Sequence, residues 1–127
     1  MSTSMKRTVV AAAAATLATV ALAAPAHANN KTIQLTAPSG AAHAVLSWDD
    51  SVDTLCLTLR SGAAGAVAHA DMHLVGGGNA QTLSVSPNRT RHCTGNLSIA
   101  EDRLAEMRVY GGTNTWWNTT GWVQFYT

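Results

Sequence analysis

Short segments with a two-residue period dominate this chain. In "AVAHADMHLV" (residues 66–75), apolar side chains alternate with polar ones, and in "DTLCLTLR" (residues 53–60) three leucines occupy every second position. Successive side chains of a β-strand point to opposite faces, so this period predicts strands with one buried face. Stretches rich in Gly, Asn, Ser and Pro separate the segments and predict turns. We therefore expect an all-β fold, a small antiparallel β-sandwich or partly open barrel of about eight short strands.

One segment carries a helical signature. In "SIAEDRLAEM" (residues 98–107), Ser98 is followed three residues later by Glu101, the spacing of a capping box. The residues after Glu106 again alternate between polar and apolar. This segment predicts at most one helical turn, followed by a strand.

The N-terminal residues have the three-part pattern of a secretory signal peptide. Lys6 and Arg7 precede the apolar run "TVVAAAAATLATVALAA", and Ala26 and Ala28 occupy the small-residue positions of an A-x-A cleavage site. The alternative is a membrane anchor, because the run is about as long as the shortest spanning helices. The polar stretch "NNKTIQ" follows directly, without a stop-transfer flank, and this favours a cleaved signal peptide.

Cleavage after Ala28 divides the chain into a signal peptide (residues 1–28) and a single secreted, extracellular domain (residues 29–127). The mature chain of 99 residues has the size of one domain. Its six Lys and Arg residues against seven Asp and Glu give a net charge of −1 with His neutral. Without a basic cluster we expect no nucleic-acid partner. Without an amphipathic basic helix we expect no membrane partner after cleavage.

Cys56 and Cys93 are the only cysteines. An even pair in an exported protein predicts a disulfide bond. In the chain-entropy model such a bridge stabilises the fold by about 4 kcal/mol. The alternation turns Cys56 away from the leucine face of its strand. The bridge then lies on an outer face, or both faces are covered, or a bulge turns the side chain.

The Ala-rich leader, the short mature domain and the cysteines in otherwise ordinary strands together resemble the small secreted single-domain β-proteins of actinobacteria. The resemblance is one of architecture and composition along the whole chain. It implies a disulfide-stabilised extracellular β-domain and assigns no functional residue.

His69, Asp71 and His73 form the most metal-like group, because imidazole and carboxylate are ligands of zinc, copper and iron. Their strand limits this interpretation, since residues four apart lie roughly 13 Å from each other at ~3.3 Å per residue. At most two of the three could share one ion, with help from His43 or His92. The alternative is the solvated polar face of a half-buried strand. We expect no bound metal and no cofactor.

The chain contains no ordered catalytic motif such as G-x-S-x-G. We therefore expect a non-catalytic protein, with a small metal-assisted hydrolase around the His69 strand as the alternative.

Three of the four tryptophans fall in the C-terminal stretch "YGGTNTWWNTTGWVQFYT". Trp116 and Trp117 are adjacent, so in an extended segment they point to opposite faces. Trp122 and Tyr126 share a face of the last predicted strand, and Val123 and Phe125 share the other. We expect one of Trp116 and Trp117 to join the core together with Val123 and Phe125.

Two interpretations of these aromatic residues stay open. All three tryptophans could bury against the sheet and the disulfide, because aromatic side chains are mostly well buried. Alternatively, a subset of Trp116, Trp117, Trp122 and Tyr126 forms an exposed ligand-binding patch. The second interpretation predicts a secreted binding domain for an unknown extracellular protein or a glycan, including a carbohydrate-binding module that stacks sugars on tryptophan.

Overall fold

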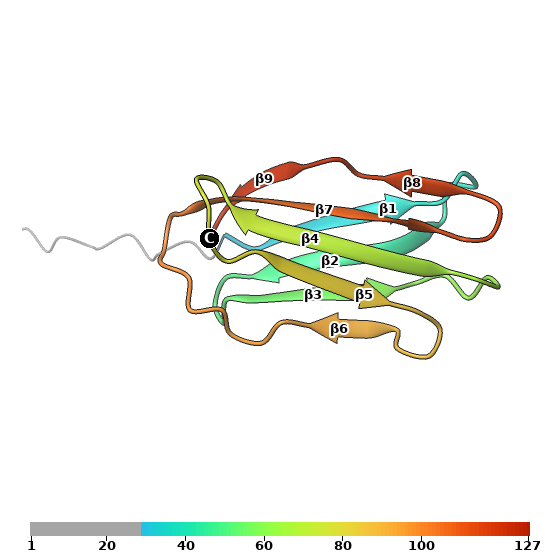
Figure 1. The fold of residues 1–127 in the computed structure, drawn as a ribbon, viewed down its shortest axis with the longest axis horizontal. Coiled ribbons are helices and arrows are strands. Elements are labelled where there is room, and N and C mark those ends of the chain that lie inside the picture. Colours follow the sequence, from blue (N-terminus) through green and yellow to red (C-terminus); the bar gives the residue numbers. More distant parts are fainter. Residues whose placement is uncertain (1–28) are drawn as a thin grey trace, which may run out of the picture.

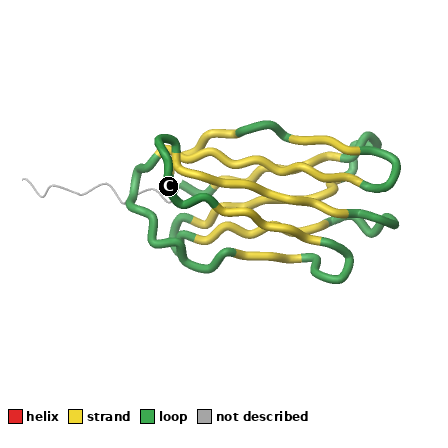
Figure 2. The backbone as a smooth tube through the Cα atoms, in the orientation of Figure 1, coloured by secondary structure: helices red, strands yellow, loops and turns green. Residues whose placement is uncertain are grey.

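The computed structural model describes residues 29–127, which form nine β-strands and no helix (Figures 1 and 2). The strands are β1 (Lys31–Thr36), β2 (Ala42–Asp49), β3 (Thr54–Leu59), β4 (Val67–Leu74), β5 (Gln81–Val85), β6 (Arg91–Cys93), β7 (Leu104–Gly112), β8 (Trp117–Thr119) and β9 (Val123–Tyr126). The predicted signal peptide, residues 1–28, lies outside the described residues. Within residues 29–127 no helix has the length and hydropathy needed to cross a membrane.

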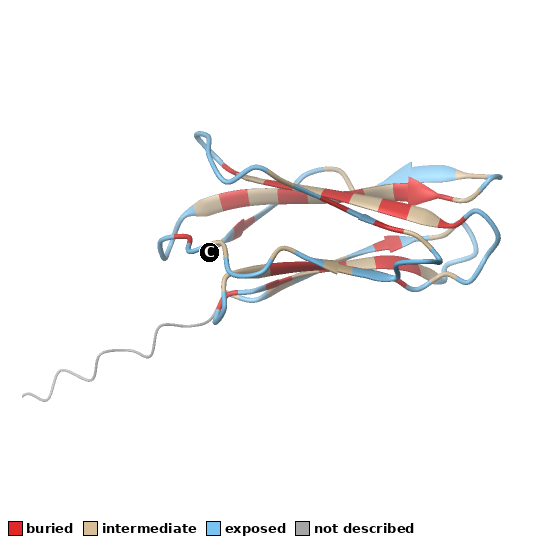
Figure 3. Ribbon diagram, turned by 60° about the horizontal axis from the view of Figure 1, so that its bottom comes forward, coloured by how far each residue is buried: buried red, intermediate tan, exposed pale blue. Residues whose placement is uncertain are grey.

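The strands form two antiparallel sheets that pack as two layers (Figures 1 and 3). The four-stranded sheet has the order β1-β2-β3-β6. The five-stranded sheet has the order β5-β4-β7-β8, and β9 also pairs with β7. The predicted all-β sandwich is confirmed. The three-residue strand β8 was not predicted, because the sequence around it is rich in Gly and Asn.

The core lies between the sheets and follows the two-residue period. Buried and half-buried residues alternate along the strands (Figure 3), most regularly along β4 and β7. The largest fully buried side chain is Trp48 of β2, whose ring lies 5.8 Å from that of Phe125. Phe125 joins the core as expected, but Trp116 and Val123 are only half-buried. The prediction that Trp116 or Trp117 supplies the large core residue is therefore wrong, because Trp48 already occupies an inward position of a central strand.

The segment before β7 forms no helix, and the predicted capping box is absent. Ser98 and Asp102 adopt left-handed backbone conformations, with φ of +51° and +58°. Asp53, in the β2–β3 connection, holds this segment, because its carboxylate accepts a hydrogen bond from the amide of Ile99 (3.0 Å). A long-range hydrogen bond thus takes the place of the expected local capping interaction. The strand predicted to follow, β7, does form.

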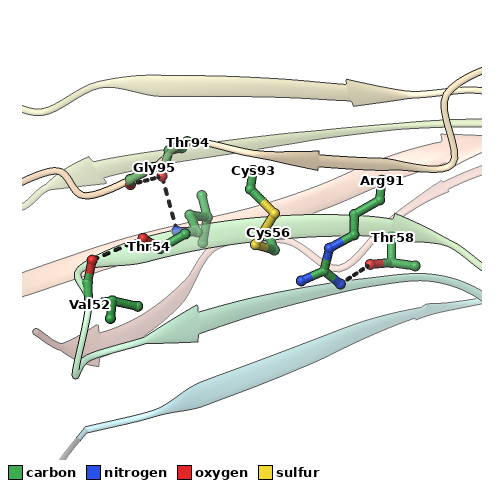
Figure 4. Close-up of a disulfide and its surroundings, with 9 residues drawn as sticks. Val52, Thr54, Cys56, Thr58, Arg91, Cys93, Thr94 and Gly95 are labelled. Atoms are coloured by element: carbon green, nitrogen blue, oxygen red, sulfur yellow. Dashed lines mark hydrogen bonds between the residues drawn. A yellow bond between two sulfur atoms is a disulfide. The ribbon is translucent and has the colours of Figure 1, made fainter.

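The predicted disulfide bond between Cys56 and Cys93 is present (Figure 4). The two cysteines are direct cross-strand partners on β3 and β6. The neighbours of Cys56 on β3, Leu55 and Leu57, point into the core, so the bridge lies on the outer face of the four-stranded sheet. It attaches the short edge strand β6 to β3, and such a bond is compatible with an extracellular location.

Candidate binding face of the five-stranded sheet

The polar residues of β4 lie on the outer face of the five-stranded sheet, because the alternate residues Ala68, Ala70, Met72 and Leu74 are buried. Each of the three polar residues of β4 has a direct cross-strand partner on β7. The pairs are His69 with Tyr110, Asp71 with Arg108, and His73 with Glu106. Two strands far apart in the sequence thus form one continuous row of polar and aromatic side chains.

A β-bulge interrupts the neighbouring edge, where β8 and β9 both pair with β7. Two residues of β7 (108–109) lie opposite three residues of the edge segment (120–122). Gly121 has φ of +69°, a left-handed value that glycine adopts at little cost. Thr120 completes the irregular pairing: its amide donates to the carbonyl of Val109 (2.9 Å), and its hydroxyl accepts from the amide of Val109 (3.0 Å).

The bulge brings Trp117 and Trp122 to the same face. These residues are five apart, and on a regular strand an odd separation puts side chains on opposite faces. With one extra residue between them, both rings join the outer face, and their exposed fractions are 59% and 41%. We call the resulting surface the aromatic face; it consists of His69, Asp71, His73, Glu106, Arg108, Tyr110, Trp117 and Trp122.

Three rings gather at one end of the aromatic face. The His69 ring stacks on Tyr110, with centroids 5.3 Å apart and an interplanar angle of 27°. Trp117 lies 6.2 Å from His69 and 6.4 Å from Tyr110. On the side of β5, the hydroxyl of Ser84 lies 2.8 Å from Nδ1 of His69. This end therefore presents an exposed indole supported by two further rings.

Arg108 connects the middle of the aromatic face. Its guanidinium donates two hydrogen bonds to Oδ2 of Asp71, at 3.0 and 2.8 Å. The same group lies over the ring of Trp122 at 4.5 Å and over that of Tyr110 at 5.2 Å. A cation within about 6 Å of a ring centroid is attracted to its π-face. Arg108 thus restrains rings at both ends of the face.

The other end of the aromatic face is formed by Trp122 and His73. Their rings meet edge to face, with centroids 4.7 Å apart. Nε2 of His73 lies 2.7 Å from Oε1 of Glu106, its cross-strand partner. Trp122 therefore has an imidazole and a guanidinium as direct neighbours, and these contacts fix its orientation.

The residues predicted as possible metal ligands, His69, Asp71 and His73, instead contact neighbouring side chains. Oδ2 of Asp71 accepts both bonds from Arg108, and a guanidinium at that distance opposes a bound cation. His69 and His73 contact different partners, Ser84 and Glu106. In the part of the chain that the structure describes, no three His, Cys, Asp or Glu residues form a group that could hold a metal ion.

The two histidines that could have completed a metal site lie elsewhere. A register shift on β2 turns His43 inward, where its Nε2 lies 2.9 Å from the carbonyl of Val67. Trp116 packs edge to face on this buried imidazole at 4.7 Å, which explains why it is half-buried. His92 lies on β6 and contacts the backbone of Ser84.

Tyr126 also lies on the outer side of the five-stranded sheet, opposite Leu104 and beyond the aromatic face. Its exposed fraction is 55%. It lines a shallow depression together with Gln124, Phe125 and residues 29–31. Of the four proposed ligand-binding aromatics, the structure therefore groups Trp117 and Trp122, sets Tyr126 apart, and turns Trp116 away.

Both acidic residues of the aromatic face have a cross-strand partner on the same face. Arg108 faces Asp71, and His73 faces Glu106. No run of one sign is left to attract a highly charged ligand. The face therefore offers exposed rings and hydrogen-bonding groups with little net charge.

The sequence interpretation had assigned no role to Glu106, Arg108 and Tyr110. A signal for them exists, since they alternate with the apolar residues Met107 and Val109 in the same way as the polar residues of β4. What links the two strands is their pairing, which local periodicity does not encode.

A scan against protein-family models matches no family, and searches of curated proteins and of solved structures find no match to this chain. The geometry of the aromatic face therefore carries the functional argument by itself.

Proposed function

We propose that the protein is a secreted, non-catalytic binding domain that engages an extracellular ligand through the aromatic face. The observation that supports this most is the position of Trp117 and Trp122, two exposed indoles brought to one side of the sheet by a bulge. Clustered exposed aromatics mark interaction surfaces more often than isolated apolar residues do. The signal-peptide pattern and the disulfide support the extracellular location.

The support around the rings favours binding. Arg108 and His73 hold Trp122, and Tyr110 and His69 support Trp117. Side chains that are already ordered lose less conformational freedom when a ligand arrives. Aromatic anchors in such positions commonly carry much of the binding energy.

A neutral polysaccharide is the ligand class that fits this surface best. Trp117 lies opposite Gly112 and Trp122 beside Arg108, so the indoles are separated by roughly 13 Å along the sheet at ~3.3 Å per residue. A pyranose ring offers an apolar C–H face for stacking and hydroxyl groups at its edge. The paired polar groups between the indoles are donors and acceptors for such hydroxyls. An extracellular protein is the alternative partner.

Retention on insoluble chitin, cellulose and isolated bacterial cell wall tests the proposal. We expect the exported protein to be retained by at least one of them. Retention on chitin or cellulose should depend little on salt, because these two polysaccharides are neutral. Replacing both Trp117 and Trp122 by Ala should weaken retention by thirtyfold or more, on the scale of about 2 kcal/mol for a binding hot spot. Val52→Ala is the control, since Val52 is also exposed but lies in the β2–β3 turn.

Equal retention of the double variant and the parent protein would show that the aromatic face is not the site. If no polysaccharide retains the protein, a pull-down from secreted proteins tests the alternative partner. Capture by the parent and by Val52→Ala, but not by the double variant, would support the aromatic face as the binding site and identify the ligand as a protein.

A further inference from the structure

Asp50 is a buried carboxylate at the end of β2. Only 8% of its surface is exposed. Its Oδ1 accepts a hydrogen bond from Nε1 of the buried Trp48 at 3.3 Å. Its Oδ2 accepts one from the backbone nitrogen of Asn29 at 3.0 Å. The carboxylate therefore lies between the core and the first described residue.

No side-chain cation compensates this carboxylate within residues 29–127. The Arg108–Asp71 ion pair and the His73–Glu106 contact both lie on the aromatic face. A buried carboxylate without a positive partner is costly, because burial removes its hydration. The neutral donors from Trp48 and Asn29 offset only part of this loss.

The predicted cleavage point lies next to this carboxylate. Removal of the leader hydrolyses the peptide bond between Ala28 and Asn29: one water molecule is consumed, and the new carboxylate leaves with Ala28. The nitrogen of Asn29, until then a neutral amide with one hydrogen, becomes an α-ammonium group. It is the same nitrogen atom that lies 3.0 Å from Oδ2 of Asp50.

We infer that Asp50 is the capture site for the α-ammonium group that leader removal creates on Asn29. Before cleavage only the acceptor of this hydrogen bond is charged; after cleavage both partners are, and the contact becomes an ion pair. It supplies the positive charge that the surroundings of Asp50 lack. The inference concerns processing and stability, and it does not depend on which ligand the aromatic face binds.

The register of β1 positions this contact. Lys31, the first residue of β1, pairs with Trp48, so the chain runs on toward Asp50. The amide of Asp50 in turn donates to Oδ1 of Asn30 at 2.9 Å. Asn29 and Asp50 are thus fixed from both sides, and the hydrogen bond to Oδ2 of Asp50 comes from the nitrogen of Asn29 itself.

The consequence is that leader removal and the stability of the fold are coupled. The processed chain gains an ion pair at the start of the edge strand β1, and the unprocessed chain lacks it. The processed fold should therefore be more stable than the leader-bearing chain.

Two chemical modifications of the processed protein, purified after export, test the inference. Mass spectrometry first establishes that Asn29 is the N-terminal residue. Acetylation then removes the α-amino charge, and it is carried out in a Lys31→Arg background because Lys31 is the only lysine of the processed chain. Reductive dimethylation adds comparable bulk but keeps the charge. We expect acetylation to lower the melting temperature by several degrees and dimethylation to leave it nearly unchanged.

Variants of the two adjacent acids sharpen the test. Asp49→Asn, at an exposed position, should retain the full acetylation effect. Asp50→Asn should abolish it, because the partner of the ammonium is gone. If Asp50→Asn does not fold, the comparison of acetylated with dimethylated parent protein still decides. An N-terminus other than Asn29, an unchanged melting temperature after acetylation, or equal losses from both modifications would overturn the inference.

Discussion

The outer faces of the two sheets share one backbone pattern but carry different side chains. On the outer face of the four-stranded sheet, the Cys56–Cys93 bridge lies among polar residues such as Thr58 and Arg91, and the tryptophan of this sheet, Trp48, is buried. The five-stranded sheet exposes two tryptophans among paired charged residues. The first face shows that a sheet of this protein can face solvent without exposed indoles. The rings of the second face are therefore not a requirement of the fold, and this supports a role in binding.

The largest expected effect comes from breaking the bridge on the four-stranded face. Reduction, or replacement of Cys56 and Cys93 by Ser, should lower the free energy of unfolding by about 4 kcal/mol in the chain-entropy model. Thermal or urea unfolding with and without reductant measures this. Ligand binding by the fraction still folded should be unchanged, because the bridge lies on the other sheet. Two alkylatable thiols in freshly exported protein would contradict the account.

Single substitutions on the aromatic face should have the opposite profile. Trp117→Ala and Trp122→Ala should each weaken ligand binding by about 1 kcal/mol and cost less than about 1 kcal/mol of stability. Trp116→Ala should mainly cost stability, because Trp116 packs on the buried His43. About 1–2 kcal/mol is expected, below the 3–5 kcal/mol of a fully buried tryptophan. Three equal losses of stability with unchanged binding would remove the distinction.

Acrylamide quenching of fluorescence distinguishes exposed from protected tryptophans and does not require a known ligand. Trp117 and Trp122 should be accessible, and Trp48 should be protected. The double substitution of the two exposed residues should remove most of the quenchable fluorescence. Fluorescence that no quencher reaches in the parent protein would argue against an exposed patch.

Arg108 tests whether the aromatic face is preorganised. Arg108→Ala removes two hydrogen bonds to Asp71 and the cation over Trp122. Because the pair is partly exposed, we expect about 1 kcal/mol or less in stability and a comparable loss in binding. Arg108→Lys keeps the charge but loses the paired geometry, so it should rescue only part of the binding loss. Full rescue by Lys would show that charge alone matters.

The smallest expected effect is that of metal removal. Asp71 is paired with Arg108, and the histidines of β4 contact different partners. We expect chelation to leave the thermal melt unchanged and elemental analysis to show no stoichiometric metal. A zinc or copper signal that His69→Ala abolishes would reverse this interpretation.

Most of the fold followed from the sequence because the two-residue period is local. The alternation around Leu55 and Leu57 predicted a strand with one buried face, and β3 has it. The even cysteine count predicted the bridge. The alternation alone did not decide on which face of the sheet the bridge lies. The burial of Leu55 and Leu57 places the bridge on the outer face of the four-stranded sheet, where Cys56 pairs with Cys93 of β6.

The candidate site was less predictable because it depends on register. From the sequence alone, His69, Asp71 and His73 form one candidate site and the C-terminal tryptophans form a separate one. Strand order brings them together, since β4 and β8 both lie beside β7. The bulge at Gly121, which aligns Trp117 with Trp122, is likewise a property of the paired strands.

Nuclear magnetic resonance mapping of the bound surface tests the central claim most directly. The labelled processed protein is titrated with soluble oligosaccharides released from chitin, cellulose and bacterial cell wall. The account predicts that at least one of them shifts the amide signals of β4, β7 and β8 and the indole signals of Trp117 and Trp122. The amides of β1, β2 and β3 should stay in place. Shifts confined to the four-stranded sheet, or none at the aromatic face with any of these ligands, would contradict the proposed glycan-binding face.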